Sequence, residues 1–149
     1  MFMKLWQKQQ EFIMRTELDE LLIKALESEG DTAAVNPFYA AFLRTSLYLP
    51  TRKNWQATTE KPFQPLMSDL NGNVFLLVFD TLSRLEIWIG DNHDEINHVE
   101  IIGHDLVDAL GHHVYLGLNY ETPYYKEFSP NEIARLKTVV EKTKPPKKI

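Results

Sequence analysis

Residues 74–79 constrain the fold of this chain more than any other stretch. Their sequence is VFLLVF, so a strand formed here would be apolar on both of its sides. Successive side chains of a strand point to opposite faces of the sheet, and both faces of this strand therefore need cover. The preceding Asn71-Gly72-Asn73 favours a tight hairpin turn, because Asn-Gly readily adopts positive φ. We expect a central strand that pairs with residues 63–70 and has helices packed over it.

Apolar residues at helical spacing predict helices before and after this hairpin. The first helix follows Thr16, a candidate N-cap, and ends at Gly30. The second begins at Asn36, with Pro37 at the first helical position, where its missing N–H costs nothing. Two shorter helices are expected over residues 82–89 and 105–110. Further strands are expected over residues 46–50, 98–102 and 113–118.

The stretch KEFSPNEIARL, residues 126–136, predicts the start of the last helix. Ser129 stands in the N-cap position and Pro130 in the first helical position. Glu132 follows at the third, from where its side chain can reach back to the Ser129 amide in a capping box. Phe128 and Ile133 occupy the positions of a hydrophobic staple. We expect a helix over residues 130–143, and no base or partner accompanies Ser129 that would make it catalytic.

Composition favours a globular domain that does not bind nucleic acid. The 149 residues are 44% hydrophobic and 25% charged, and the net charge is −5. The absence of cysteine excludes disulfides and thiolate chemistry and favours a reducing compartment. No apolar run reaches the ~18 residues of a membrane span, and the N-terminus lacks the pattern of a signal peptide. We expect a cytoplasmic protein.

Together these patterns predict a single α+β domain, built on a mixed β-sheet of about five strands with helices packed on its faces. The domain is expected over residues 16–143. Residues 1–15 form an N-terminal extension whose apolar residues recur at helical spacing, which leaves an extra helix or a lead-in as alternatives. Residues 144–149, KPPKKI, form a basic tail.

Three segments resemble those of a known family. TELDELLIKAL (16–26) is similar to its first helix, and PFYAAFLRTSLYLP (37–50) is similar to the helix and strand that follow. KEFSPNEIARL (126–136) is similar to its closing pattern. On these segments, and on the order of the elements between them, residues 16–141 resemble the N-terminal domain of the SseB family.

This resemblance implies an α+β domain of a bacterial protein family without an established biochemical activity, and it carries over no catalytic residue. The chain departs from the family pattern at two points. Asn119-Tyr120 stands where the family has Asn-Pro. FDT, residues 79–81, stands where the family has an aromatic-Thr-Ser or Phe-Ser-Ser stretch.

Histidines suggest a metal site as an alternative, because all five lie between residues 93 and 113. His98 and Glu100 would share one face of a strand, and only one of the adjacent His112 and His113 could point the same way. The candidate ligand set is His98, Glu100, His104 and His113. No HExxH-type pair is present, so the favoured interpretation is a polar rim of exposed imidazoles. No cofactor is expected.

Aromatic residues are the better functional signal. Four tyrosines gather around the last strand and the loop after it: Tyr115, Tyr120, Tyr124 and Tyr125. Trp55 lies in a polar loop over residues 51–62. Tyrosine, tryptophan and arginine are enriched at the centres of protein interfaces. We therefore predict that these five aromatic residues bind a protein or peptide. The alternative is that Tyr115 belongs to the core and that Tyr124 and Tyr125 only cover the edge of the sheet.

The sequence leaves three functional hypotheses. The first is a non-catalytic interaction or accessory module, monomeric or homodimeric, with an unknown protein or peptide partner and without nucleic-acid or membrane binding. The second is a metal-dependent, hydrolase-like enzyme that uses the histidine region. The third is an accessory partner whose acidic surface meets a basic protein, which the net charge of −5 permits.

Overall fold

The computed structural model describes residues 14–53, 58, 60 and 64–143. The expectations for residues 1–13, for Trp55 and for the basic tail lie outside these residues. In chain order the elements are α2 (Glu17–Glu27), α3 (Thr32–Arg44), β1 (Ser46–Arg52), β2 (Met67–Leu70), β3 (Asn73–Val78), α4 (Leu82–Ile89), the 3-10 turn η1 (Gly90–Asn92), β4 (Ile96–Ile102), α5 (Gly103–Ala109), β5 (Tyr115–Leu118), β6 (Lys126–Phe128) and α6 (Pro130–Thr143). This is the α+β fold that the sequence predicted.

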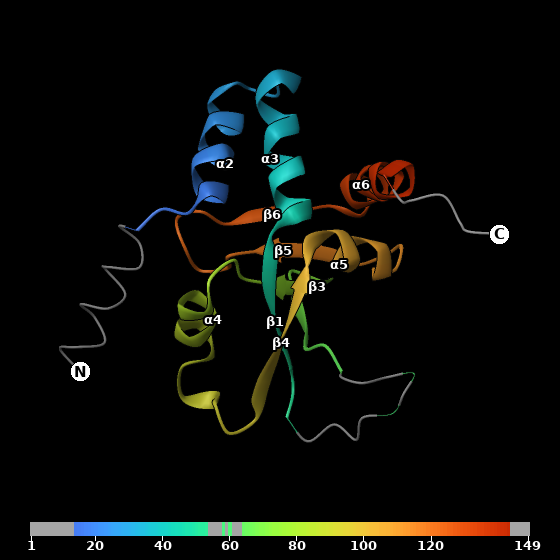
Figure 1. Cartoon of the computed structure of the whole chain (residues 1–149). Helices are drawn as coiled ribbons and strands as arrows, with labels where there is room; N and C mark the ends of the chain where they lie inside the picture. The colour runs from blue at the N-terminus through green and yellow to red at the C-terminus, as the bar shows by residue number, and fades with distance from the viewer. Residues whose placement is uncertain (1–13, 54–57, 59, 61–63, 144–149) are drawn as a thin grey trace.

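The strands form two sheets in place of the expected single one. The larger sheet has the order β2-β3-β5-β6, in which only β3 and β5 run parallel. β1 and β4 form an antiparallel ribbon, which Figure 1 shows extending away from α2, α3 and α6, with α4 beside it. Backbone bonds between Tyr48 and Phe79 (2.8 and 3.0 Å) join the ribbon to the end of β3. The three-residue β6 was not predicted, because so short a strand has no periodicity to detect.

From Phe75 onward β3 is buried on both faces, which confirms the prediction for residues 75–79, whereas Val74 is 45% exposed. Phe75, Leu77 and Phe79 enter one apolar cluster. Leu76 and Val78 enter the other, larger cluster. The hairpin before β3 turns where Asn-Gly was expected, with positive φ at both turn residues. Burial of each large apolar side chain stabilises the fold by about 1.5–3 kcal/mol.

Of the helices in the described part of the chain, α2, α3, α5 and α6 cover one face of the larger sheet and α4 lies on the other. Buried side chains of α2, α3, α5 and α6 fill the larger cluster together with Leu116, Leu118 and Phe128 of the strands. Figure 1 shows α2 and α3 side by side and α4 apart from them. α4 contributes Leu85 and Ile89 to the smaller cluster. None of the helices in the described part of the chain has the length and apolarity to cross a lipid bilayer.

Helix starts agree with the sequence in some places and differ in others. The capping box at α2 is formed: the Thr16 amide donates to Asp19 Oδ2 (2.9 Å), and the Asp19 amide donates to Thr16 Oγ1 (3.2 Å). α6 spans the predicted residues, and Ser129 Oγ accepts from the amide of Glu132 (3.2 Å). The predicted return bond of Glu132 is wrong. Its carboxylate accepts from Lys126 Nζ (3.0 Å) instead, because a charged donor makes the stronger bond.

The predicted start of α3 at Asn36 is also wrong. The helix begins at Thr32, after Asp31, whose side chain accepts from the amide of Ala33 (3.0 Å). Pro37 consequently lies inside the helix and not at its first position. The Asp31 cap, followed by two alanines with high helix propensity, outweighs the cost of the proline.

Candidate functional site

Three partly exposed tyrosines, Tyr115, Tyr120 and Tyr125, lie on β5 and on the loop between β5 and β6. Together with Gly117 of β5 and Glu127 of β6 they form what we call the tyrosine face. β5 positions its own two members of this face, because Leu116 and Leu118 between and after them point into the larger cluster on the opposite side. Gly117 is the register partner of Glu127 in β6, so both residues face the same side. α4 does not cover this part of the sheet completely, and all three tyrosines remain partly exposed.

Gly117 makes room for the ring of Tyr125. A Cβ atom at position 117 would lie 3.2 Å from Tyr125 Cε1 and 2.7 Å from Leu77 Cδ2. The Tyr125 ring therefore rests close to the backbone of β5. Its edge meets the Tyr120 ring at a centroid distance of 5.4 Å and an interplanar angle of 75°. Such edge contacts are favourable for aromatic pairs and hold both rings in place.

A carboxylate stands beside these rings. The Tyr125 hydroxyl donates to Glu127 Oε2 at 3.2 Å, and Glu127 is exposed. Burial, together with the negative charge of Glu127, raises the pKa of Tyr125 to about 12. The hydroxyl thus stays protonated near neutral pH. The face therefore offers aromatic surface next to a negative charge.

Tyr115 and Tyr48 both pack against the smaller apolar cluster. Tyr115 stacks on Phe75 at a centroid distance of 4.9 Å and an interplanar angle of 29°. Tyr48 of β1 packs against the same smaller cluster, and its hydrogen bond to Glu100 raises the pKa of its hydroxyl. A second tyrosine–glutamate pair thus lies on the ribbon. Both pairs combine an apolar ring with an acidic partner.

A buried ion cluster lies at the carboxyl end of β3 and joins it to α2 and α4. Arg84 donates through both terminal nitrogens to Asp19 (2.9 and 2.6 Å) and through Nη1 to Asp80 Oδ1 (2.9 Å). The three side chains are at most 2% exposed. Because solvent does not reach the cluster, we assign it to stability and not to binding.

Asp80 is the second carboxylate of this cluster, and three elements hold it. The Thr16 hydroxyl before α2 donates to Asp80 Oδ2 at 2.5 Å. Asn119 after β5 accepts from the Asp80 amide at 3.1 Å. Burial raises the pKa of Asp80, although the Thr16 hydrogen bond and the Arg84 charge act in the opposite direction.

Tyr124 belongs to the ion cluster and not to the tyrosine face. The Arg84 guanidinium lies 5.2 Å from the centroid of its ring. Arg15 Nε donates to its hydroxyl at 3.3 Å, and the residue is only 9% exposed. The structure thus groups Tyr115, Tyr120 and Tyr125 and separates Tyr124 from them.

Comparison with known proteins identifies the family. The family model described as the SseB protein N-terminal domain matches residues 18–135, which is more than half of the chain. This chain belongs to the SseB family. Neither a search of curated proteins nor a search of solved structures finds a match. The SseB match agrees with the resemblance predicted from the sequence over residues 16–141.

The histidines of this SseB domain do not converge. His98 and Glu100 lie on β4 and are both exposed, while His113 is exposed in the turn before β5. His104, at the start of α5, contacts Asp105 at 3.5 Å. Among the described residues, no group of three or more His, Asp or Glu side chains is placed to hold a metal ion. His98 and Glu100 of the candidate ligand set thus share β4, whereas His104 and His113 lie on other segments.

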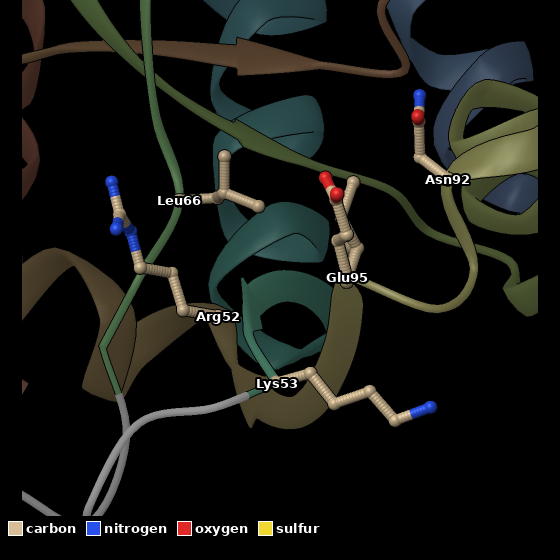
Figure 2. A pocket seen from close by; sticks show the side chains of 6 residues that line it. Arg52, Lys53, Leu66, Asn92 and Glu95 are labelled. Carbon is tan, nitrogen blue, oxygen red and sulfur yellow. The ribbon is translucent and has the colours of Figure 1, made fainter.

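A surface hollow of about 530 Å³ lies on the SseB domain where β1 meets the start of β4. Its lining residues are Arg52, Lys53, Leu66, Asn92, Glu95 and Ile96. Figure 2 shows that the Arg52 and Lys53 side chains point in different directions, and that Lys53 extends away from Glu95. The charged groups therefore do not meet at one point, and the tyrosine face remains the stronger candidate site.

Sequence reasoning missed the ion cluster of the SseB domain. A signal for it was present, because Arg84 interrupts an apolar helix pattern four residues after Asp80. A charged residue on the buried side of a helix needs a partner. Gly117 was missed as well, since alternation alone does not show that a ring will rest on a glycine.

Proposed function

We propose that this SseB domain is a non-catalytic binding module that holds a protein or peptide on its tyrosine face. The observation that carries the proposal is the gathering of Tyr115, Tyr120 and Tyr125 around Gly117 on an incompletely covered face of the sheet. Partly exposed tyrosines held by packing supply contact area at a low entropic cost, which is typical of binding surfaces. The lack of cysteine favours the reducing bacterial cytoplasm as the place of action.

No observation favours the hydrolase alternative to a similar degree. In the described part of the chain, the buried charged groups are closed to solvent and the histidines are dispersed. The binding proposal is thus the function to test first.

The test is affinity capture with the full chain as bait, followed by binding measurements with each purified candidate partner. The double variant Tyr115→Ala/Tyr125→Ala removes two rings of the face. Val139→Ala is the matched control, because this apolar residue is 45% exposed on α6, which covers the opposite side of the sheet. We expect the double variant to weaken partner binding at least about tenfold, as loss of interface tyrosines does. The control should bind as the unmodified chain does.

The proposal fails if every captured partner binds the double variant and the unmodified chain equally well. Thermal unfolding of each variant separates loss of the surface from loss of the fold. A partner lost by Val139→Ala but kept by the double variant would place binding on the helical side of the molecule.

A further inference from the structure

The exposed charged residues of the strands and loop that form the tyrosine face are acidic. Residues 115–128 form β5, β6 and the loop between them, and they contain three charged residues: Glu121, Lys126 and Glu127. Glu121 and Glu127 are exposed. Lys126 turns away, since its Nζ lies 2.9 Å from Glu132 Oε2 and 4.9 Å from the centroid of the Phe128 ring in the larger cluster. Within residues 115–128, the exposed charged side chains are therefore both acidic.

Aromatic rings and carboxylates together favour a particular kind of partner. An Arg or Lys side chain can lie with its aliphatic part over a tyrosine ring and its cationic group near a carboxylate. Tyr125 and Glu127 are joined by a hydrogen bond of 3.2 Å, so the ring and the charge are within reach of one side chain. The ring of Tyr120 stands edge-on to Tyr125 and extends the aromatic surface.

We propose that the occupant of the tyrosine face is a basic segment of a partner protein, whose Arg or Lys side chains stack on Tyr115 and Tyr125 and pair with Glu127. This inference rests on the proposed function and adds the chemistry of the partner. Charge complementarity carries it, because the exposed charged residues of 115–128 are the two acids Glu121 and Glu127, which would repel an acidic segment. A second copy of this acidic chain is disfavoured on the same ground, since its net charge is −5.

The experiment is a selection of random 12-residue peptides displayed on phage against the immobilised full chain. Individual enriched peptides are then measured by fluorescence anisotropy. We expect the enriched peptides to be rich in Arg and Lys and to bind more weakly as salt is raised. Glu127→Lys should weaken their binding about tenfold, because it removes an attraction and adds a repulsion.

Asp69→Lys is the matched control for this charge reversal. Asp69 is exposed on β2, at the opposite edge of the sheet, and its register partner Val74 faces away from Phe75. The substitution Asp69→Lys changes the net charge of the chain by the same amount as Glu127→Lys does. Equal weakening by both variants would show that only overall charge matters, and it would overturn the inference.

Other outcomes separate this inference from the proposed function. If neutral or acidic peptides are enriched and Tyr115→Ala/Tyr125→Ala abolishes their binding, the face binds peptides but the basic partner is wrong. If peptide binding survives the double variant, both proposals fail. The inference also fails if no peptide is enriched, or if sedimentation shows self-association that Glu127→Lys abolishes.

Discussion

Arg84 and Asp19 form a two-pronged ion pair inside the protein, with Nη1–Oδ1 at 2.9 Å and Nη2–Oδ2 at 2.6 Å. The two residues are separated by 65 positions in the sequence and lie on α4 and α2. α2 packs with the larger apolar cluster, whereas α4 packs with the smaller one. The pair therefore connects the two sides of the fold through a planar guanidinium, which matches the geometry of a carboxylate better than lysine could.

Replacement of Arg84 by Met should destabilise the protein by about 3–5 kcal/mol, because Asp19 and Asp80 would remain buried without their cation. Equilibrium unfolding in urea measures the loss. Arg44→Met is the matched control, since Arg44 pairs with Glu17 at 2.6 Å but both side chains are more than half exposed. The Arg44→Met variant should lower the free energy of unfolding by less than about 1 kcal/mol. Similar losses in the two variants would contradict the structural role of the buried cluster.

Asp80 gives the cluster a dependence on pH. Burial raises its pKa above the usual value of 3.8. Between 3.8 and the raised pKa, the folded protein binds more protons at this carboxyl than the unfolded chain does. The free energy of unfolding contributed by Asp80 should therefore be greatest below pH 3.8 and should fall as pH rises through the raised pKa.

The variant Asp80→Asn tests this sign, because the amide keeps an acceptor for Arg84 and cannot ionise. The difference in unfolding free energy, unmodified chain minus variant, should become smaller as pH rises from about 4 to 7. Parallel stability curves over this range would show that the environment of Asp80 does not disfavour its charged form.

Local patterns predicted those parts of the fold that local interactions determine. The Asn71-Gly72 turn, the doubly apolar β3 and the whole of α6 follow from dihedral preference, alternation and spacing within a few residues. Contacts between distant segments decided the rest. Glu132 left its capping role because Lys126 and Tyr39 lie beside it in the folded chain.

The candidate site shows the same division. The sequence indicated that the site contains several tyrosines, because they follow one another along β5 and the next loop. It could not indicate which of these tyrosines share one face of the sheet. Tyr124 and Tyr125 are neighbours in sequence, yet one packs on Arg84 and the other on Gly117. The position of the Tyr124 ring depends on Arg84, about forty residues earlier in the chain. The sequence of the loop alone therefore does not predict it.

Gly103 should be intolerant of even one added carbon. A Cβ atom there would lie 2.1 Å from the Phe42 carbonyl oxygen, and the Gly103 amide donates to Thr45 O at 2.9 Å. Gly103→Ala would force the start of α5 away from the end of α3, so we expect a loss of about 3 kcal/mol or more. Gly111→Ala is the control, because a Cβ atom at that position meets nothing within 4 Å. Thermal unfolding measures the Tm of each variant. An equal decrease of Tm in both variants would contradict this close packing.

The Tyr125–Glu127 pair makes a prediction that does not need a partner. Burial and the Glu127 charge raise the pKa of Tyr125 to about 12, so its hydroxyl should remain protonated up to about pH 11. Glu127→Gln removes the charge but leaves the burial, so the pKa should fall part of the way towards 10. Titration of the ¹³Cζ signals of labelled tyrosines by NMR resolves the individual rings.

Asp69→Asn, at the opposite edge of the sheet, is the control and should leave the Tyr125 titration unchanged. An unchanged pKa in Glu127→Gln would mean that the carboxylate does not act on the ring, and the aromatic–acidic character assigned to the tyrosine face would be lost with it.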